Sequence, residues 1–314
     1  MKILILYFIE TQQNVQKDDV KISIFAAMDY TKSYILNEKS SLILEGGGLR
    51  GVFTCGVLDN FMERGIKFPF TIGVSAGACN GLSYMSGQRK RAKYSNIDLL
   101  EKYDYVGLRY LFTQRNIMDF NLLFEKFPTE IIPYDYDAYA KSEGRYVMVT
   151  TNCLTGEANY FEEKHSQKRI MDIVRSSSSL PFVCPIAQVD GIPMLDGGIA
   201  DSIPVEFARK EGFTNNFIVV TRNKGYRKKL QGKSFATKLF YSKYPNLQRA
   251  IENRNSIYNR TLDFVEEMEE KGLITVLRPV KPLEVDRMEK DIGKLNALYR
   301  EGYELAAKIN FEKL

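Results

Sequence analysis

Long apolar runs and a strong charge of one sign are both missing from this sequence of 314 residues. No stretch approaches the roughly 20 consecutive apolar residues of a membrane-spanning helix, so no transmembrane helix is predicted. The net charge is only +5, from 44 basic and 39 acidic residues, which gives no reason to expect a nucleic-acid partner. A weak attraction to an anionic membrane surface is compatible with this charge, although most proteins of this balance bind neither lipid nor nucleic acid.

Cysteine and histidine are scarce, which limits the metal and redox chemistry available. None of the four cysteines belongs to a CxxC pair, and the single histidine lies at metal-ligand spacing from none of them. We therefore expect no metal site, and free thiols in a reducing, cytoplasmic compartment, with peripheral contact at a membrane left open. The cysteines are Cys55, Cys79, Cys153 and Cys184.

Predicted strands alternate with predicted helices along the chain, and no glycine- or proline-rich linker interrupts them. This order indicates a three-layer α/β/α fold with a largely parallel central sheet. We divide the chain into an N-terminal extension at residues 1–40, a central part at residues 41–212, and a helix-rich part at residues 213–314 that completes the same globule. The apolar run at residues 1–9 favours an edge strand or amphipathic lead-in over a signal peptide, because no small-residue cleavage site follows it.

The stretch from residue 42 to residue 81 carries two glycine clusters between predicted strands and helices. The first, residues 46–51 (GGGLRG), follows a short apolar strand and opens a helix, so its backbone amides can form a nest for an anion. The second, residues 73–77 (GVSAG), places Ser75 on a strand-to-helix turn. An anion site beside a serine suggests acyl transfer.

The first cluster also matches the GxGxxG pattern of dinucleotide-binding folds, with Gly46, Gly48 and Gly51 at the required spacing. That pattern expects an acidic residue about 20 positions further on, at the end of the second strand, where it binds the ribose hydroxyl. Here the second strand ends at Val74 and Ser75, without an acid. We therefore expect no nucleotide cofactor, and the motifs imply no other cofactor.

The GxSxG cluster has the features of a nucleophile elbow. Gly73 and Gly77 leave room for neighbouring backbone, and the helix after Ser75 directs its positive end toward developing negative charge. The amides of residues 46–48 then suit the oxyanion of a tetrahedral intermediate. Arg50 either adds a cation beside this site or pairs with an acid on the surface.

A catalytic serine needs a base, and the single histidine is poorly placed to supply it. His165 lies among charged and polar residues and precedes Asp196, whereas serine, acid, then histidine is the usual hydrolase order. We expect His165 on the surface and a carboxylate as the base. Asp196, before two glycines, has the character of a turn residue as much as a base, and Asp201, before a serine and close to a proline, suits a helix cap.

Three motifs in order resemble those of the patatin-like phospholipase family: GGGLRG at residues 46–51, GVSAG at residues 73–77 and DGG at residues 196–198. The resemblance covers roughly residues 41–212, including the serine-rich loop at residues 176–181. It implies a patatin-like α/β fold and a Ser-Asp dyad that works without histidine.

The same resemblance implies a role for each motif residue. Ser75 would be the nucleophile, and Asp196 would be the base that deprotonates Ser75 and later a water. The glycines that complete the elbow and the DGG motif are Gly73, Gly77, Gly197 and Gly198. The oxyanion hole would be formed by Gly46, Gly47, Gly48, Leu49, Arg50 and Gly51.

The resemblance also implies a lipid acyl hydrolase of lipid catabolism, phospholipase A-like or a lipid esterase, with a lipid or acyl ester as its substrate and an acyl-enzyme as its intermediate. A thioesterase or transacylase with the same dyad is an alternative, as is a non-catalytic regulatory protein, although the intact dyad argues against the latter. Residues 97–140, rich in aromatics, are predicted to form short helices and loops over the site, partly as a lid. The basic clusters at residues 88–94 and 222–233 are expected to be solvated, with a membrane- or phosphate-facing patch as the alternative for the first.

Overall fold

A computed structural model describes residues 34–230, 232 and 234–311, and the structural statements below refer to these residues. These described residues belong to one compact unit. The predicted edge strand or lead-in at residues 1–9, like most of the predicted N-terminal extension, lies outside the described residues.

The centre of the fold is an eight-stranded sheet. Its strands are β2 (Ser40–Leu44), β4 (Phe70–Val74), β5 (Arg145–Asn152), β6 (Ala158–Glu162), β7 (Ala187–Val189), β8 (Ile192–Asp196), β9 (Asn215–Val219) and β10 (Ile274–Leu277). Hydrogen-bonded pairs connect them along the path β10-β9-β2-β4-β5-β8-β7, and β6 also pairs with β5. The run from β10 to β5 is parallel, whereas β6, β7 and β8 are antiparallel to their neighbours. The predicted, largely parallel sheet is therefore confirmed.

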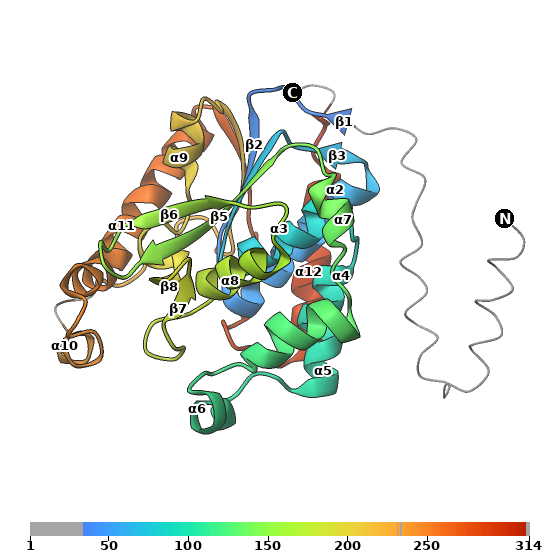
Figure 1. Cartoon of the computed structure of the whole chain (residues 1–314). Helices are drawn as coiled ribbons and strands as arrows, with labels where there is room; N and C mark the ends of the chain where they lie inside the picture. The colour runs from blue at the N-terminus through green and yellow to red at the C-terminus, as the bar shows by residue number, and fades with distance from the viewer. Residues whose placement is uncertain (1–33, 231, 233, 312–314) are drawn as a thin grey trace, which may run out of the picture. The chain divides into compact units, whose positions relative to one another are not determined.

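Helices cover both faces of this sheet, as Figure 1 shows. One face packs against α2 (Val52–Glu63), α3 (Ala76–Met85), α8 (Gln167–Ser177) and α12 (Ile292–Ala307). The other packs against α9 (Val205–Lys210) and α11 (Pro245–Glu270). Shorter helices connect these elements: η2 (Gly48–Gly51), α4 (Arg91–Lys93), η3 (Tyr94–Asp98), α5 (Leu99–Tyr103), α6 (Arg109–Gln114), η4 (Leu122–Ile131), α7 (Tyr136–Ala140), η5 (Gly197–Ile199) and α10 (Phe235–Phe240).

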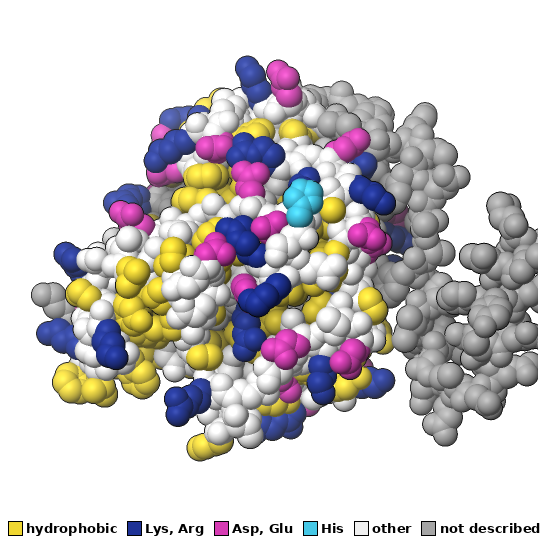
Figure 2. Space-filling model, viewed as in Figure 1, with side chains coloured by type: hydrophobic (Ala, Val, Ile, Leu, Met, Phe, Trp, Pro, Cys, Tyr) yellow, Lys and Arg dark blue, Asp and Glu magenta, His cyan; other side chains and the backbone are white. Residues whose placement is uncertain are grey.

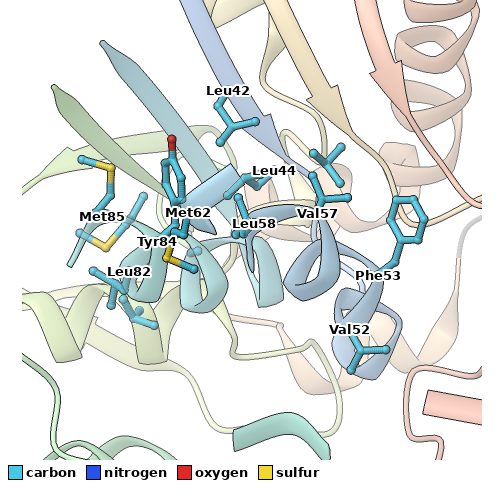
Figure 3. Close-up of a cluster of buried hydrophobic side chains, with 14 of the residues drawn as sticks. Leu42, Leu44, Val52, Phe53, Val57, Leu58, Met62, Leu82, Tyr84 and Met85 are labelled. Atoms are coloured by element: carbon cyan, nitrogen blue, oxygen red, sulfur yellow. The ribbon is translucent and has the colours of Figure 1, made fainter. Parts of the chain in front are cut away.

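The two-sided burial follows from the strand sequences. In β2, Leu42 and Leu44 belong to the cluster beneath α2 and α3, which Figure 3 shows, while Ile43 between them belongs to the cluster on the opposite face. Successive side chains of a strand point to opposite faces, so a strand covered on both sides has a continuous apolar run. The predicted order of strand, turn, helix, strand, turn and helix over residues 42–81 is confirmed by β2, η2, α2, β4 and α3.

The C-terminal third of the chain joins the same sheet and helix layers. β9 and β10 extend the sheet beyond β2, and α12 packs tightly on α2. A side chain at Gly56 would overlap the backbone carbonyl of Tyr299, and one at Gly302 would overlap that of Phe53. Helix α12 begins at Ile292, because the Asp291 side chain caps it by accepting from the Lys294 amide at 3.0 Å.

Candidate active site

Ser75 occupies the turn between β4 and α3 in a strained backbone conformation. Its φ of 55° and ψ of −123° are unusual for a residue with a side chain. Two hydrogen bonds connect the turn to strand β5. The Ser75 amide donates to Ser177 Oγ at 2.8 Å, and the Ser177 hydroxyl donates to the Val149 carbonyl at 2.6 Å. Such strain at a strand-to-helix turn is the geometry predicted for a nucleophile elbow.

Glycines allow the two motif loops to touch through their backbones. A Cβ at Gly46 would lie 2.8 Å from the Cβ of Ser75, and a Cβ at Gly77 would overlap the carbonyl oxygen of Leu44. A Cβ at Gly73 would lie 2.7 Å from the Gly77 carbonyl oxygen. The sequence pattern GxSxG is therefore required here by close approach of backbone to backbone.

Strand β5 brings Asp196 next to the serine turn. Val74, just before Ser75, pairs with Val149 of β5, and Asp196 at the end of β8 pairs with Thr150, the next residue along. Because β6 pairs with β5 across both positions, β4 and β8 must share the opposite edge of β5. The chain segments that end in Ser75 and Asp196 therefore meet at one point of the sheet.

The carboxylate of Asp196 is buried, and only one of its two oxygens has a hydrogen-bond partner among the described residues. The residue is 1% exposed, and its Oδ1 accepts from the Gly198 amide at 2.7 Å. Its Oδ2 has no hydrogen-bond partner within the described part of the chain. Ser75 and Asp196 both line a polar cavity with about 360 Å³ of empty volume. Oδ2 is thus the atom of Asp196 that is free to accept a proton there.

The glycine-rich motif contributes unequally to this cavity. Gly46, Gly47 and Gly48 line it, and Gly48 adopts a left-handed φ of 59° that favours glycine. The amide of Leu49, however, donates to the carbonyl of Arg287 at 3.0 Å, so this amide already has a hydrogen-bond partner. Gly51 does not line the cavity and instead accepts a hydrogen bond from the Asn80 side chain at 2.9 Å through its carbonyl.

Arg50 and the DGG glycines lie near Ser75 and Asp196. Arg50 lines the polar cavity, is 5% exposed, and makes no ion pair with any described residue, so the alternative of a surface ion pair does not hold. The carbonyl of Gly198 accepts from Arg254 Nε at 2.7 Å, which ties the loop after Asp196 to α11. Gly197 is packed so tightly that a side chain there would overlap the Val149 carbonyl.

A larger, mainly apolar cavity, with about 1050 Å³ of empty space that includes open solvent, is also lined by Ser75. It shares Gly48, Ser75 and Leu180 with the polar cavity. Its wall includes aromatic side chains from the segment predicted to lie over the site, among them Tyr105, Phe120, Phe124, Phe127 and Tyr134. Part of the segment 97–140 therefore forms a wall of this cavity.

The basic clusters are less solvated than expected. Arg91 lines the apolar cavity, donates to the Ile132 carbonyl at 2.9 Å and stacks on the ring of Tyr134. Burial lowers the pKa of its guanidinium. In the second cluster, Lys228 lines the polar cavity, with its Nζ 3.3 Å from the centroid of the Tyr258 ring. Both expectations of a purely solvated loop were wrong at these positions, because charge runs in a sequence do not reveal which side chain the fold covers.

The remaining candidates lie away from both cavities. His165 is exposed, as predicted, and is the cyan side chain on the surface in Figure 2. Asp201 accepts a hydrogen bond from the Tyr160 hydroxyl at 2.8 Å, and burial raises its pKa to about 6. It does not cap α9, whose N-cap residue is Pro204.

Sequence reasoning missed three cations of the polar cavity: Lys228, Arg254 and Arg287. They come from a loop, from α11 and from the segment before α12, and no local motif marks them. All four cysteines are free thiols. Within the described ranges, no cluster of histidine, cysteine and carboxylate side chains could hold a metal ion, and no helix is long and apolar enough to cross a membrane.

Comparisons with known proteins find several chains that are similar in sequence. The chain is 28% identical over 268 residues to the uncharacterized protein YjjU of Escherichia coli K12, covering 83% of this chain and 74% of that protein. It is 24% identical over 289 residues to lysophospholipase NTE1 of Candida albicans, covering 86% of this chain and 20% of that protein. It is 22% identical over 292 residues to lysophospholipase NTE1 of Scheffersomyces stipitis, covering 87% of this chain and 18% of that protein. The chain therefore spans about a fifth of the length of these two relatives.

The crystal structure of VipD from Legionella pneumophila is also similar, with a TM-score of 0.48 and 13% identity, over 87% of this chain and 66% of that one. A family model described as "Domain of unknown function (DUF6363)" matches residues 244–309. The model of the patatin-like phospholipases matches residues 42–209, which is more than half of the chain and includes all three motifs. The chain therefore belongs to the patatin-like phospholipase family.

Proposed function

We propose that the protein hydrolyses acyl esters of lipids, with Ser75 as the nucleophile and Asp196 as the general base. The observation that carries this proposal is the position of Ser75. It sits on a strained turn where a polar cavity shared with Asp196 meets a large apolar cavity. An ester between an acyl chain and a polar group fits such a junction, because each part finds a matching environment.

In the acylation step, Ser75 Oγ attacks the ester carbonyl carbon while its proton passes to Asp196 Oδ2. Negative charge then develops on the carbonyl oxygen of the tetrahedral intermediate. The amides of Gly47 and Gly48 and the first amide of α3, at Ala76, are the donors proposed to bind this charge. Collapse of the intermediate breaks the ester bond, and the leaving alkoxide takes the proton from Asp196.

In the deacylation step, a water gives a proton to Asp196 and attacks the acyl-Ser75 carbonyl. The second tetrahedral intermediate expels Ser75 Oγ, which recovers the proton from Asp196. The free fatty acid leaves and the enzyme returns to its starting state. Because Leu49 already donates its amide to Arg287, we leave it out of the proposed oxyanion hole.

Release of fatty acid from defined substrates tests this proposal. The purified chain is incubated with lysophosphatidylcholine, phosphatidylcholine and an acyl-coenzyme A of the same chain length, and free fatty acid is measured. We expect release from at least one oxygen ester, and none from a Ser75→Ala control. Cleavage of the thioester alone would assign a thioesterase, and absence of release from every substrate would refute hydrolysis.

The apolar cavity is proposed to hold the acyl chain, and filling it should shorten the chains accepted. Ala92 is 7% exposed and lines this cavity. In an Ala92→Phe variant, we expect the ratio of kcat/KM for p-nitrophenyl decanoate over p-nitrophenyl acetate to fall at least tenfold, because a ring fills space that a long chain needs. A ratio equal to that of the wild type would place the acyl chain elsewhere.

The short helix α10 is proposed to contact a membrane surface. Phe235, Leu239 and Phe240 are 80%, 66% and 62% exposed, and hydrophobic side chains gather over α10 at the lower left of Figure 2. The helix lies beside the site, since the ring of Phe240 packs on that of Phe182 at 5.8 Å, two residues after Leu180. An exposed apolar patch beside basic residues such as Lys238 is typical of a lipid-facing surface.

A Phe235→Ser/Phe240→Ser double variant tests this contact. We expect at least a fivefold loss of sedimentation with anionic vesicles, because two aromatic anchors are removed. Hydrolysis of a monomeric ester such as p-nitrophenyl butyrate serves as the reference for folding. Vesicle binding equal to that of the wild type would exclude α10 as the contact.

A further inference from the structure

The loop that follows Asp196 contains two adjacent glycines, and the second of them holds the carboxylate. The amide of Gly198 makes the hydrogen bond to Asp196 Oδ1 at 2.7 Å. Glycine has the largest backbone freedom of any residue, so this amide does not keep one direction by itself. Other parts of the structure must fix the loop if Oδ1 is to be held while Oδ2 stays free for the proton of Ser75.

Neutral groups close to the loop fix part of it. The Asp196 amide donates to the Ser179 carbonyl at 2.8 Å, and the Thr151 hydroxyl donates to the Asp196 carbonyl at 2.8 Å. The carbonyl of Gly198 accepts from the Ser202 hydroxyl at 2.8 Å. A carbonyl oxygen has two lone pairs, so the Gly198 carbonyl can accept from one further donor.

That donor is Arg254, which reaches the loop from α11. Its Nε donates to the Gly198 carbonyl at 2.7 Å. Because the donor is charged, this hydrogen bond is stronger than those from the neutral groups. The carbonyl and the amide of Gly198 belong to one residue, so a bond that holds the carbonyl also restricts the direction of the amide that binds Asp196.

The guanidinium of Arg254 lies close to the carboxylate of Asp196 without binding it. A Cβ at Gly198 would lie 3.0 Å from Asp196 Oδ1 and 3.5 Å from Arg254 Nη2, so both groups face the same small space. Within the described ranges no hydrogen bond joins the two groups, and Oδ2 has no partner. A direct ion pair would compete with Ser75 for the base, whereas this arrangement leaves Oδ2 available.

The charges around Arg254 agree with this arrangement. Burial lowers the pKa of its guanidinium, while the nearby charge of Asp196 raises it. A positive charge near a carboxylate favours the ionised form, which is the form that can act as a base. The other charged side chains that line the same cavity are Glu45, Arg50, Lys228 and Arg287, and the thiols of Cys79 and Cys184 also lie near enough to be affected by Asp196.

We propose that Arg254 is a positioning residue for Asp196: by holding the Gly198 carbonyl, it keeps Oδ1 on the Gly198 amide and presents Oδ2 to Ser75. The inference rests on the proposed function and gives a role in it to residues 244–309, the segment matched by the family model of unknown function. Loss of Arg254 should therefore act through Asp196 and not through substrate binding.

A double-mutant cycle tests this dependence. Arg254→Gln, Asp196→Asn and the double variant are compared with the wild-type chain by the rate of fluorophosphonate labelling and by kinetics on p-nitrophenyl butyrate. We expect Arg254→Gln to lower kcat and the labelling rate by at least about 30-fold, because the base is misplaced, with KM within about threefold. In the Asp196→Asn background the same change should lower the labelling rate by less than about threefold, because the base is already absent.

A conservative variant and a control locate the effect. Lysine keeps the charge and a hydrogen-bond donor, so Arg254→Lys should remain within about fivefold of the wild-type rate. Arg260 is exposed on the same helix, and Arg260→Gln should keep the wild-type rate. Thermal unfolding followed by circular dichroism shows whether each variant is folded at the assay temperature.

The outcomes separate this inference from the proposed function. A loss that Arg254→Gln causes beside Asp196 but not beside its asparagine replacement supports a positioning role. An equal loss in both backgrounds would overturn it, since Arg254 would then act on the fold or on substrate binding. Wild-type rates in Arg254→Gln would overturn it as well, and leave Ser75 and Asp196 in their roles. Wild-type labelling in Asp196→Asn would instead refute the proposed base.

Discussion

Replacing Ser75 by alanine is expected to lower kcat/KM for ester hydrolysis by at least about 10⁴-fold, because loss of the nucleophile leaves only the binding site and the oxyanion donors. Alanine keeps the Cβ of the serine and is subject to the same backbone strain at this turn, so the fold should persist. Release of p-nitrophenol from p-nitrophenyl butyrate measures the rate. A fluorophosphonate probe measures the nucleophile directly, with one label expected per wild-type chain and none in the variant.

The control for this variant is Ser256→Ala, which removes a hydroxyl from an exposed position on α11. It should keep both the hydrolysis rate and the labelling of the wild type. Labelling that persists in Ser75→Ala would assign the reactive residue elsewhere, and a loss of labelling in both variants would point to unfolding. Circular dichroism of the three proteins distinguishes these cases.

Replacing Asp196 by asparagine is expected to lower kcat/KM by about 10³-fold, within the range for loss of a general base. The amide side chain has nearly the same shape, and its oxygen can still accept from the Gly198 amide. Its nitrogen, in the place of the unpartnered Oδ2, has no lone pair available to accept the proton of Ser75. The variant should therefore retain the geometry of the site and lose its base. Steady-state kinetics on p-nitrophenyl butyrate and the rate of fluorophosphonate labelling both measure the loss.

Asp201→Asn is the matched control for the base. Asp201 is bound to the Tyr160 hydroxyl and lines neither cavity, so its variant should stay within about threefold of the wild-type rate. If Asp201→Asn proved the more damaging of the two changes, the base would have to be reassigned. An Asp196→Asn variant within tenfold of the wild type would lead to the same conclusion.

The proposed site draws on more of the chain than the family motifs. Arg254 and Arg287 fall within the second matched region, residues 244–309, and the carbonyl of Arg287 also binds the amide of Leu49 in the glycine-rich motif. The C-terminal third therefore supports the glycine-rich loop and supplies the charges of the polar cavity.

Local features of the site were predictable because a few adjacent residues determine them. A strained turn with backbone contact on both sides needs the glycines of GVSAG. The single histidine is poorly placed in the sequence to act as a base, which favours a carboxylate in that role. The alternating strands and helices likewise indicated the three layers, since apolar periodicity is a local property.

Long-range features depended on the tertiary structure. The meeting of Ser75 with Asp196 follows from the register of β5, which pairs with β4 along its first part and with β8 along its last. The burial of Arg91 and Lys228 depends on which segments cover them, and a run of basic letters carries no such information. Sequence by itself therefore determined the serine turn, its glycines and the kind of base required. Only the pairing of distant strands decided where that base lies and which cations surround it, because strand register and packing bring together residues that no local pattern connects.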